Sequence, residues 1–258
     1  MDTIKSPDTN RIDEVLENYE QFIRHQVGYG DFLRHRNRYK SDVNIIKTFY
    51  KDGEILEIGS VPCHLTTILK LLGYPVIGVD LHPFRYQSII DKFKLNIKKC
   101  DIERTHLPFS DGKFKFILFN EVIEHLRIDP LFALSEINRV LSNNGTLMLT
   151  TPNLYSIQQI VRFLIGRGFG DPVSEFTKLR RLGHMGHIRE YSHTDIKRFL
   201  AANNFKIESV SYKHYYYPKT KRGMVAYILF HLFPSRFRSY QVVLAKKVGP
   251  ANTLKPLF

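Results

Sequence analysis

The chain has 258 residues, of which 43% are hydrophobic and 24% are charged, values typical of a protein that buries a substantial core. No apolar run reaches the roughly 18 residues that a transmembrane helix needs. The N-terminus also lacks the apolar stretch of a secretory signal, so we expect a cytoplasmic protein.

The net charge of +13 is concentrated toward the C-terminus. No Asp or Glu follows Glu208, whereas nine basic residues do: Lys213, Lys219, Lys221, Arg222, Arg236, Arg238, Lys246, Lys247 and Lys255. This asymmetry indicates an anionic partner, which could be a phosphate-bearing substrate, a nucleic acid or lipid headgroups. The charge alone does not distinguish these three.

The first part of the chain is predicted to be helical. Residues 11–50 carry apolar side chains at spacings of three and four, so we predict a helical N-terminal cap over residues 1–50.

From Glu54 onward, short apolar runs alternate with helical patterns. Strands are predicted over residues 54–59, 76–80, 97–101, 114–120, 145–151, 206–214 and 241–247. Helices are predicted over residues 64–73 and 129–141 and from Ser192, which forms a capping-box pattern with Asp195. The alternation predicts one α/β domain over residues 51–258, with a Rossmann-like, doubly wound, mostly parallel sheet.

A glycine-containing segment over residues 152–190 interrupts this pattern. Such segments at the carboxyl end of a parallel sheet often cover a substrate, so we predict a substrate lid here.

Polar side chains end four of the predicted strands. They are Glu57 and Gly59 on the first strand, Asp80 on the second, Asp101 after the third and Asn120 on the fourth. Ligands bind outside the carboxyl ends of such strands. Asp80 lies 21 residues beyond Gly59, a spacing at which a carboxylate can accept hydrogen bonds from both ribose hydroxyls. These residues therefore predict a nucleoside site.

The loop after the first strand argues against a dinucleotide. EIGSVPCHLT has one glycine, whereas a pyrophosphate site needs several so that the backbone can approach the phosphates. S-adenosylmethionine (SAM) has no phosphate, so its site tolerates side chains at Val61, Pro62 and Cys63.

Five segments in this order and spacing resemble the motifs of class I SAM-dependent methyltransferases: EIGSVPCHLT, VIGVD, KCDIERTHLPF, FNEVIEHL and INRVLSNNGTLMLTTPN. The resemblance is close over residues 53–153. It implies a seven-stranded sheet whose last strand is antiparallel. The sequence departs from the family in the first loop, where most members have further glycines at the positions of Val61 and Cys63.

The resemblance also implies how the cofactor is bound. Glu57 and Gly59 would lie beside the methionine part, Asp80 would bind the ribose, and Asp101 with Ile102 would lie at the adenine.

A second group of candidate residues follows the fourth strand. If a helix starts in NEVIEHL, then Glu121, Glu124 and His125 share a face that points into the substrate cleft. Downstream, GHMGHIREYS offers His184 and His187 before the next helix.

NEVIEHL, TPN and GHIREYS are similar to two groups of methyltransferases. One acts in polysaccharide and lipid biosynthesis; the other methylates ribose 2′-hydroxyls of small RNAs with a metal. In the second group the matching positions, Glu121, Glu124, His125 and His187, hold magnesium. Without a metal, His125 would act as a base or position the substrate. Two imidazoles are unusual magnesium ligands, so we assign no metal.

The run HYYYPKTKR and the apolar residues 223–233 that follow it allow two interpretations. They form either a core helix or a shallow contact with an anionic membrane; aromatic and cationic residues can also stack on bases.

We predict an O-methyltransferase that acts on a small-molecule or glycan acceptor, specifically a sugar or lipid-linked saccharide hydroxyl, with Glu124, His125 and His187 as catalytic residues. The alternatives are an RNA ribose 2′-O-methyltransferase and a non-catalytic binding module that kept the fold. RNA is less favoured because no separate RNA-binding motif is recognisable.

Overall fold

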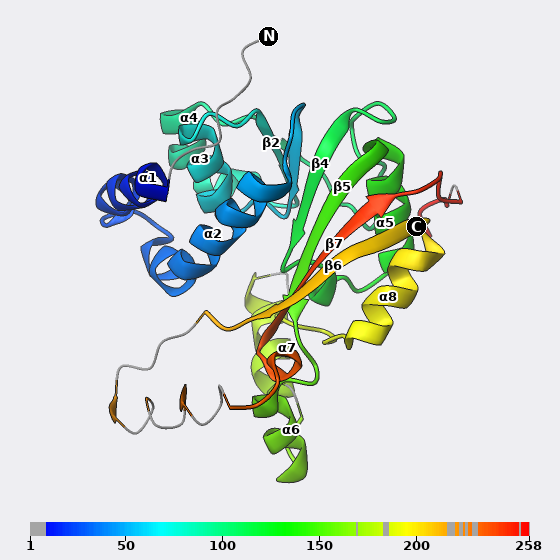
Figure 1. The fold of residues 1–258 in the computed structure, drawn as a ribbon. Coiled ribbons are helices and arrows are strands. Elements are labelled where there is room, and N and C mark those ends of the chain that lie inside the picture. The colour runs from blue at the N-terminus through cyan, green and yellow to red at the C-terminus, as the bar shows by residue number, and fades with distance from the viewer. Residues whose placement is uncertain are drawn as a thin grey trace.

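The computed structural model describes residues 9–168, 170–182, 186–215, 220–221, 224, 227–228, 232–252 and 254–257. A central sheet carries helices on both faces (Figure 1). Its seven strands in the described residues are β1 (Ile55–Ile58), β2 (Val76–Asp80), β3 (Ile97–Lys99), β4 (Phe114–Asn120), β5 (Leu141–Pro152), β6 (Phe205–Lys213) and β7 (Tyr240–Lys247).

The strand order is β3-β2-β1-β4-β5-β7-β6. Strands β1 to β5 pair in parallel, and β7 runs antiparallel to both β5 and β6. The predicted doubly wound sheet with an antiparallel last strand is confirmed. Parallel strands need both faces covered, which explains why β1 is buried at every residue.

Two apolar cores lie on the two faces of the sheet. Helices α5 (Pro130–Val140) and α8 (His193–Ala202) cover one face. The other face is covered by α1 (Thr9–Ile23), α2 (Tyr29–Phe49), α3 (His64–Leu71) and α4 (Gln87–Phe93). The Ser192–Asp195 capping box that starts α8 is present as predicted.

The N-terminal region is two helices, with a break at Gly28. Gly28 has φ +100°, and a Cβ there would lie 3.1–3.2 Å from the rings of Tyr86 and His64. The Gly28 carbonyl accepts from His64 Nε2 at 3.1 Å, which leaves His64 Nδ1 to accept from the Tyr19 hydroxyl at 2.8 Å. A turn requiring glycine therefore anchors α1 and α2 to α3.

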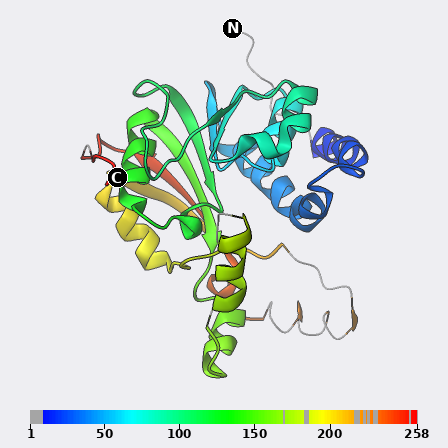
Figure 2. The same cartoon turned by 180° about the vertical axis from the view of Figure 1, so that it is seen from behind.

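The predicted lid segment contains α6 (Ile157–Leu164) and α7 (Pro172–Leu182). Both helices project from the carboxyl end of the parallel strands, beyond the helices that cover the sheet (Figures 1 and 2). Most of the apolar run at 223–233 lies outside the described residues. Where the chain is described, no helix is long and apolar enough to cross a bilayer.

We predict that Gly28→Ala destabilises the protein by about 1–3 kcal/mol, because the substituted backbone is strained and its Cβ crowds two rings. Gly30→Ala is the matched control, since Gly30 lies within α2 and a Cβ there would meet no other atom within 4 Å. That control should leave stability unchanged or raise it by up to about 1 kcal/mol. Urea unfolding of both variants measures the difference, and equal effects would contradict the role of the Gly28 turn.

Candidate functional site

The loop between β1 and α3 turns toward β2. Gly59 has φ +74°, and a Cβ there would come within 2.5 Å of Val122 Cγ2, so the turn excludes a side chain. Cys63 also takes a left-handed conformation, with φ 66°, at a position where a glycine would be unstrained. The Val61 amide donates to Asp80 Oδ2 at 3.0 Å. The loop therefore keeps a glycine-type backbone although it has lost glycines.

A pocket lies beside this loop, bounded by the ends of β1, β2 and the segment after β3. Four predicted cofactor residues line it: Gly59, Asp80, Asp101 and Ile102. The two oxygens of Asp80 accept from the amides of Val61 and His82, which fixes the carboxylate at the pocket wall. The arrangement fits a nucleoside, with a carboxylate for the ribose and apolar contacts for the base.

The other two predicted cofactor residues lie outside the residues that line this pocket. Glu57 is buried on β1, where the Thr66 hydroxyl donates to it, and burial raises the pKa of Glu57 to about 8. Asn120 ends β4, and neither its amide nitrogen nor its oxygen has a hydrogen-bond partner among the described residues. Buried polar atoms are rarely left unpaired, so Asn120 offers both a donor and an acceptor to a bound molecule.

The NEVIEHL segment does not form the predicted α-helix. That helix would have placed Glu121 and Glu124 on one face. The segment forms one short 3-10 helix over Ile123–His125, because Glu121 takes a left-handed backbone conformation with φ 56°. The Glu121 carboxylate turns to α2, 3.5 Å from Arg38 Nη1, and accepts from the Thr150 hydroxyl at 2.9 Å. Glu121 and Glu124 therefore face different partners.

Glu124 is fully buried at the end of the sheet. The Thr151 hydroxyl donates to Glu124 Oε2 at 3.0 Å, while Oε1 has no hydrogen-bond partner among the described residues. Burial, reinforced by the negative charge of Glu121, raises the pKa of Glu124 well above its ordinary value. The raised pKa favours the protonated form of Glu124, and that form can donate a hydrogen bond.

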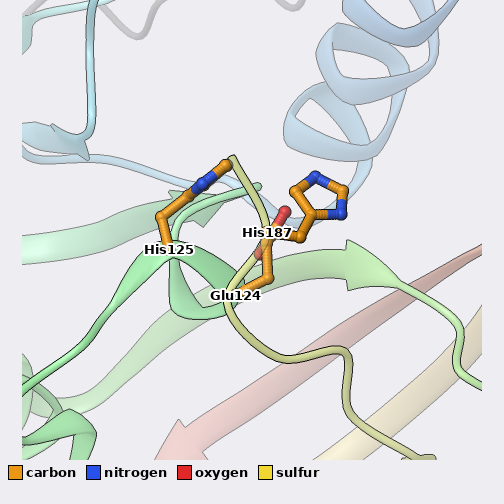
Figure 3. A group of neighbouring side chains, drawn as sticks. All are labelled: Glu124, His125 and His187. Atoms are coloured by element: carbon orange, nitrogen blue, oxygen red, sulfur yellow. The ribbon is translucent and has the colours of Figure 1, made fainter. Parts of the chain in front are cut away.

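His125 and His187 lie next to Glu124, although they come from different segments. Glu124 and His125 follow β4, and His187 reaches them from the lid segment (Figure 3). The two imidazole rings are 5.1 Å apart between centroids. His125 Nδ1 lies 2.8 Å from the Gly186 carbonyl oxygen, and His187 Nδ1 lies 3.3 Å from Glu190 Oε1.

The contact with Gly186 determines which nitrogen of His125 carries the proton and which has the lone pair. A carbonyl oxygen only accepts, so Nδ1 of His125 carries the proton and a neutral ring has its lone pair on Nε2. The third histidine of the predicted region, His184, lies outside the described residues.

The donor set at this point does not suit magnesium. Glu124, His125 and His187 each present a ligand atom, and these atoms lie within 4.8 Å of one another. Glu121, the fourth position that the resemblance implied, is paired with Arg38 instead. One carboxylate and two imidazoles favour a borderline transition metal, whereas magnesium prefers oxygen ligands.

Helix α2 brings two charged side chains to the site. The sequence alone predicted α2 only as part of the N-terminal cap. Arg38 pairs with Glu121, and Asp42 is buried one helical turn further along. The sequence gives a signal for the burial of Asp42, because Asp42 lies beside the buried apolar residues Tyr39, Val43 and Ile46 on α2. A carboxylate on an apolar helix face indicates either a buried partner or a ligand.

We predict that Asp80→Ala weakens binding of S-adenosylhomocysteine by about 2–4 kcal/mol, because the ribose loses two charge-assisted hydrogen bonds. Calorimetric titration measures this loss. Asp91→Ala, which removes an exposed carboxylate from α4, is the control and should bind normally. Unchanged affinity in Asp80→Ala would remove Asp80 from the cofactor site.

Comparison with known proteins agrees with this fold. A family model described as a methyltransferase domain matches residues 32–210, more than half of the chain. The chain is 32% identical over 139 residues to the uncharacterized protein MJ1252 of Methanocaldococcus jannaschii, covering 52% of each. It is 33% identical over 100 residues to the uncharacterized methyltransferase YodH of Bacillus subtilis, covering 38% of this chain and 42% of YodH. The chain thus matches about half or less of the length of these curated relatives.

Solved structures show the same fold at low sequence identity. A SAM-dependent methyltransferase of Thermotoga maritima, described as a possible histamine N-methyltransferase, superposes with a TM-score of 0.57 at 20% identity, covering 90% of this chain and 99% of that one. The PH0226 protein of Pyrococcus horikoshii gives a TM-score of 0.58 at 16% identity, covering 88% and 98%. The chain belongs to the methyltransferase domain family, and it has the fold of SAM-dependent methyltransferases.

Proposed function

We propose that this methyltransferase transfers a methyl group from SAM to a hydroxyl oxygen, with His125 as the general base. The observation that carries the proposal is the His125 Nδ1 contact with the Gly186 carbonyl, which places the basic lone pair on Nε2. His125 also lines the pocket that contains Asp80 and Asp101, so the base lies at the border of the cofactor site.

When bound, SAM supplies an electrophilic methyl group on its sulfonium. The residues of the chain then have separate tasks. His125 Nε2 takes the proton of the acceptor hydroxyl as its oxygen becomes the nucleophile. The raised pKa of Glu124 favours its protonated form, which can donate a hydrogen bond and orient that oxygen. Glu190 holds His187 through Nδ1, so His187 can also face the acceptor through Nε2.

A sugar hydroxyl of a lipid-linked saccharide is the acceptor that we propose. The lid supports this choice, because it exposes large apolar side chains beside cations. The apolar side chains are Val161, Phe163, Leu164, Ile165, Val173 and Phe176. The exposed cations of the same segment are Arg167, Lys178, Arg180 and Arg181. An apolar surface rimmed by cations suits an anionic membrane, where a cytoplasmic enzyme would meet such an acceptor peripherally.

The C-terminal basic region also exposes apolar and basic side chains. Met224, Ile228 and Phe233 are exposed, as are Lys221 and Arg236. Arg238 instead donates to the Tyr212 carbonyl. Lys219, Arg222 and Phe230, which belong to the same predicted surface, lie outside the described residues.

Methylation of an RNA ribose is the second candidate, and the cluster of Glu124, His125 and His187 is the observation that favours it. We do not include magnesium in the proposed reaction, because the described donor set does not suit that ion.

We predict that His125→Ala lowers kcat by roughly 100-fold or more, because a general base typically contributes that much. A radiolabelled methyl-transfer assay on fractionated cell extracts identifies the acceptor and measures the rate. Affinity for S-adenosylhomocysteine should stay unchanged, and His25→Ala, at an exposed position, serves as control.

Three results would change this assignment. Full activity of His125→Ala would remove the base. Loss of activity in chelator, restored by an added divalent ion, would replace the metal-free reaction with a metal-dependent one. If the chain does not bind SAM in a calorimetric titration, the non-catalytic alternative holds.

We further predict salt-sensitive binding to vesicles that contain anionic lipid. Leu164→Ser with Ile165→Ser should weaken this binding by roughly 30-fold or more, since each buried apolar side chain contributes about 1 kcal/mol or more and about 1.4 kcal/mol is tenfold. The matched control is Val248→Ser with Leu257→Ser, two exposed apolar positions outside the lid. Co-sedimentation with competing RNA in the same sample separates the two anionic partners. If the wild-type protein binds neither vesicles nor RNA at low salt, the exposed cations of the lid and the C-terminal region only interact with water.

A further inference from the structure

Helix α2 buries two charged side chains at the carboxyl edge of the sheet. Asp42 is 1% exposed, and the side chain of Arg38 is 14% exposed. The two residues are four positions apart, so they lie on the same face of the helix. Arg38 reaches Glu121 at 3.5 Å. Both side chains therefore face the ends of the parallel strands.

More acids surround Arg38 than one guanidinium can pair with. Its positive charge lowers the pKa of Asp42, Glu57, Glu121 and Glu124, which places it near all four. Burial nevertheless raises the pKa of each above its ordinary value, to about 7 for Asp42 and about 8 for Glu57. The charge of Lys213 also lowers the pKa of Asp42, but the four acids still outnumber these two cations, and a buried acid without a partner is unfavourable.

Several polar atoms of this cluster have no partner. Neither carboxylate oxygen of Asp42 has a hydrogen-bond partner among the described residues, and the same holds for both amide atoms of Asn120. Buried polar groups in folded proteins are almost always paired. Unpaired atoms on two elements that meet at a ligand-binding edge indicate where a polar ligand is bound.

The strand order gives the direction in which the cofactor extends. The pocket beside Asp80 on β2 continues to Asp101 after β3, which accounts for the nucleoside. The order β3-β2-β1-β4 leaves the rest of the cofactor to extend over β1 and β4, where Glu57 and Asn120 lie. The charges of Asp80 and Asp42 both raise the pKa of Glu57, so α2 lies near this path.

We propose that Arg38 and Asp42 bind the amino-acid end of SAM, with the guanidinium on the α-carboxylate and Asp42 on the α-ammonium. A guanidinium matches a carboxylate through two parallel hydrogen bonds. The ammonium supplies a positive charge that the cluster lacks. The assignment rests on the cofactor alone and is independent of the acceptor and of His125.

The test compares two ligands that differ only in the part that α2 is proposed to bind. S-adenosylhomocysteine has the amino-acid end, and 5′-methylthioadenosine lacks it. In calorimetric titrations, Arg38→Met and Asp42→Asn should each weaken S-adenosylhomocysteine binding by about tenfold or more. Their affinity for 5′-methylthioadenosine should stay within about twofold of wild type. Equal losses for both ligands, or no loss for S-adenosylhomocysteine, would overturn the proposal.

Arg36→Met is the matched control, because Arg36 lies on the same helix but pairs with Glu20 of α1 at 3.0 Å. It should leave both affinities unchanged. If Arg38→Met does not fold, Arg38→Met combined with Glu121→Gln removes both partners of the ion pair and is titrated in its place.

Melting temperatures separate binding from a structural role. The pKa of Asp42 is raised from 3.8 to about 7, so the folded state loses stability as the pH rises through that range. Asp42→Asn replaces the costly carboxylate by a neutral side chain of the same shape. It should therefore melt higher than wild type at pH 8.5, with a smaller gain at pH 5, while binding S-adenosylhomocysteine more weakly. A lower melting temperature at pH 8.5 together with unchanged binding would show that Asp42 only supports the fold.

Discussion

The parallel register of β2, β1, β4 and β5 is the constraint on which the site depends. Because the four strands run the same way, the residues that end them lie along one edge. Asp80 ends β2, Asn120 ends β4, and the hydroxyls of Thr150 and Thr151 belong to β5. The antiparallel β7 pairs with β5 along its length through backbone hydrogen bonds.

The same edge buries several carboxyl groups close together, which lowers the stability of the protein when no ligand is bound. Glu124 retains one unpaired oxygen, and Asp42 retains two, among the described residues. An apolar residue at either position would pack better in the absence of a ligand. Sites that bind a charged ligand commonly carry such a cost, because the groups that the ligand pairs are unpaired before it binds.

The sheet could be predicted because its signals are local. Apolar runs bounded by turns predict all seven strands, and the Ser192–Asp195 pair predicts the start of α8. Two features of the site could not be read in this way. Glu121 takes a left-handed conformation and pairs with Arg38, a contact between distant segments that periodicity does not register. The charged residues of α2 do not stand out in the sequence, because packing alone accounts for the apolar face that surrounds Asp42.

The contact between His125 and the lid has a consequence for the order of events. Ile188 and Arg189 donate backbone hydrogen bonds to the Glu124 carbonyl, and Gly186 supplies the acceptor for His125 Nδ1. The segment over residues 186–189 therefore also selects the tautomer of His125. Without the Gly186 acceptor, the Nδ1 proton could move to Nε2, which would take the basic lone pair away from Nε2. The position of this segment and the basicity of His125 Nε2 are therefore coupled.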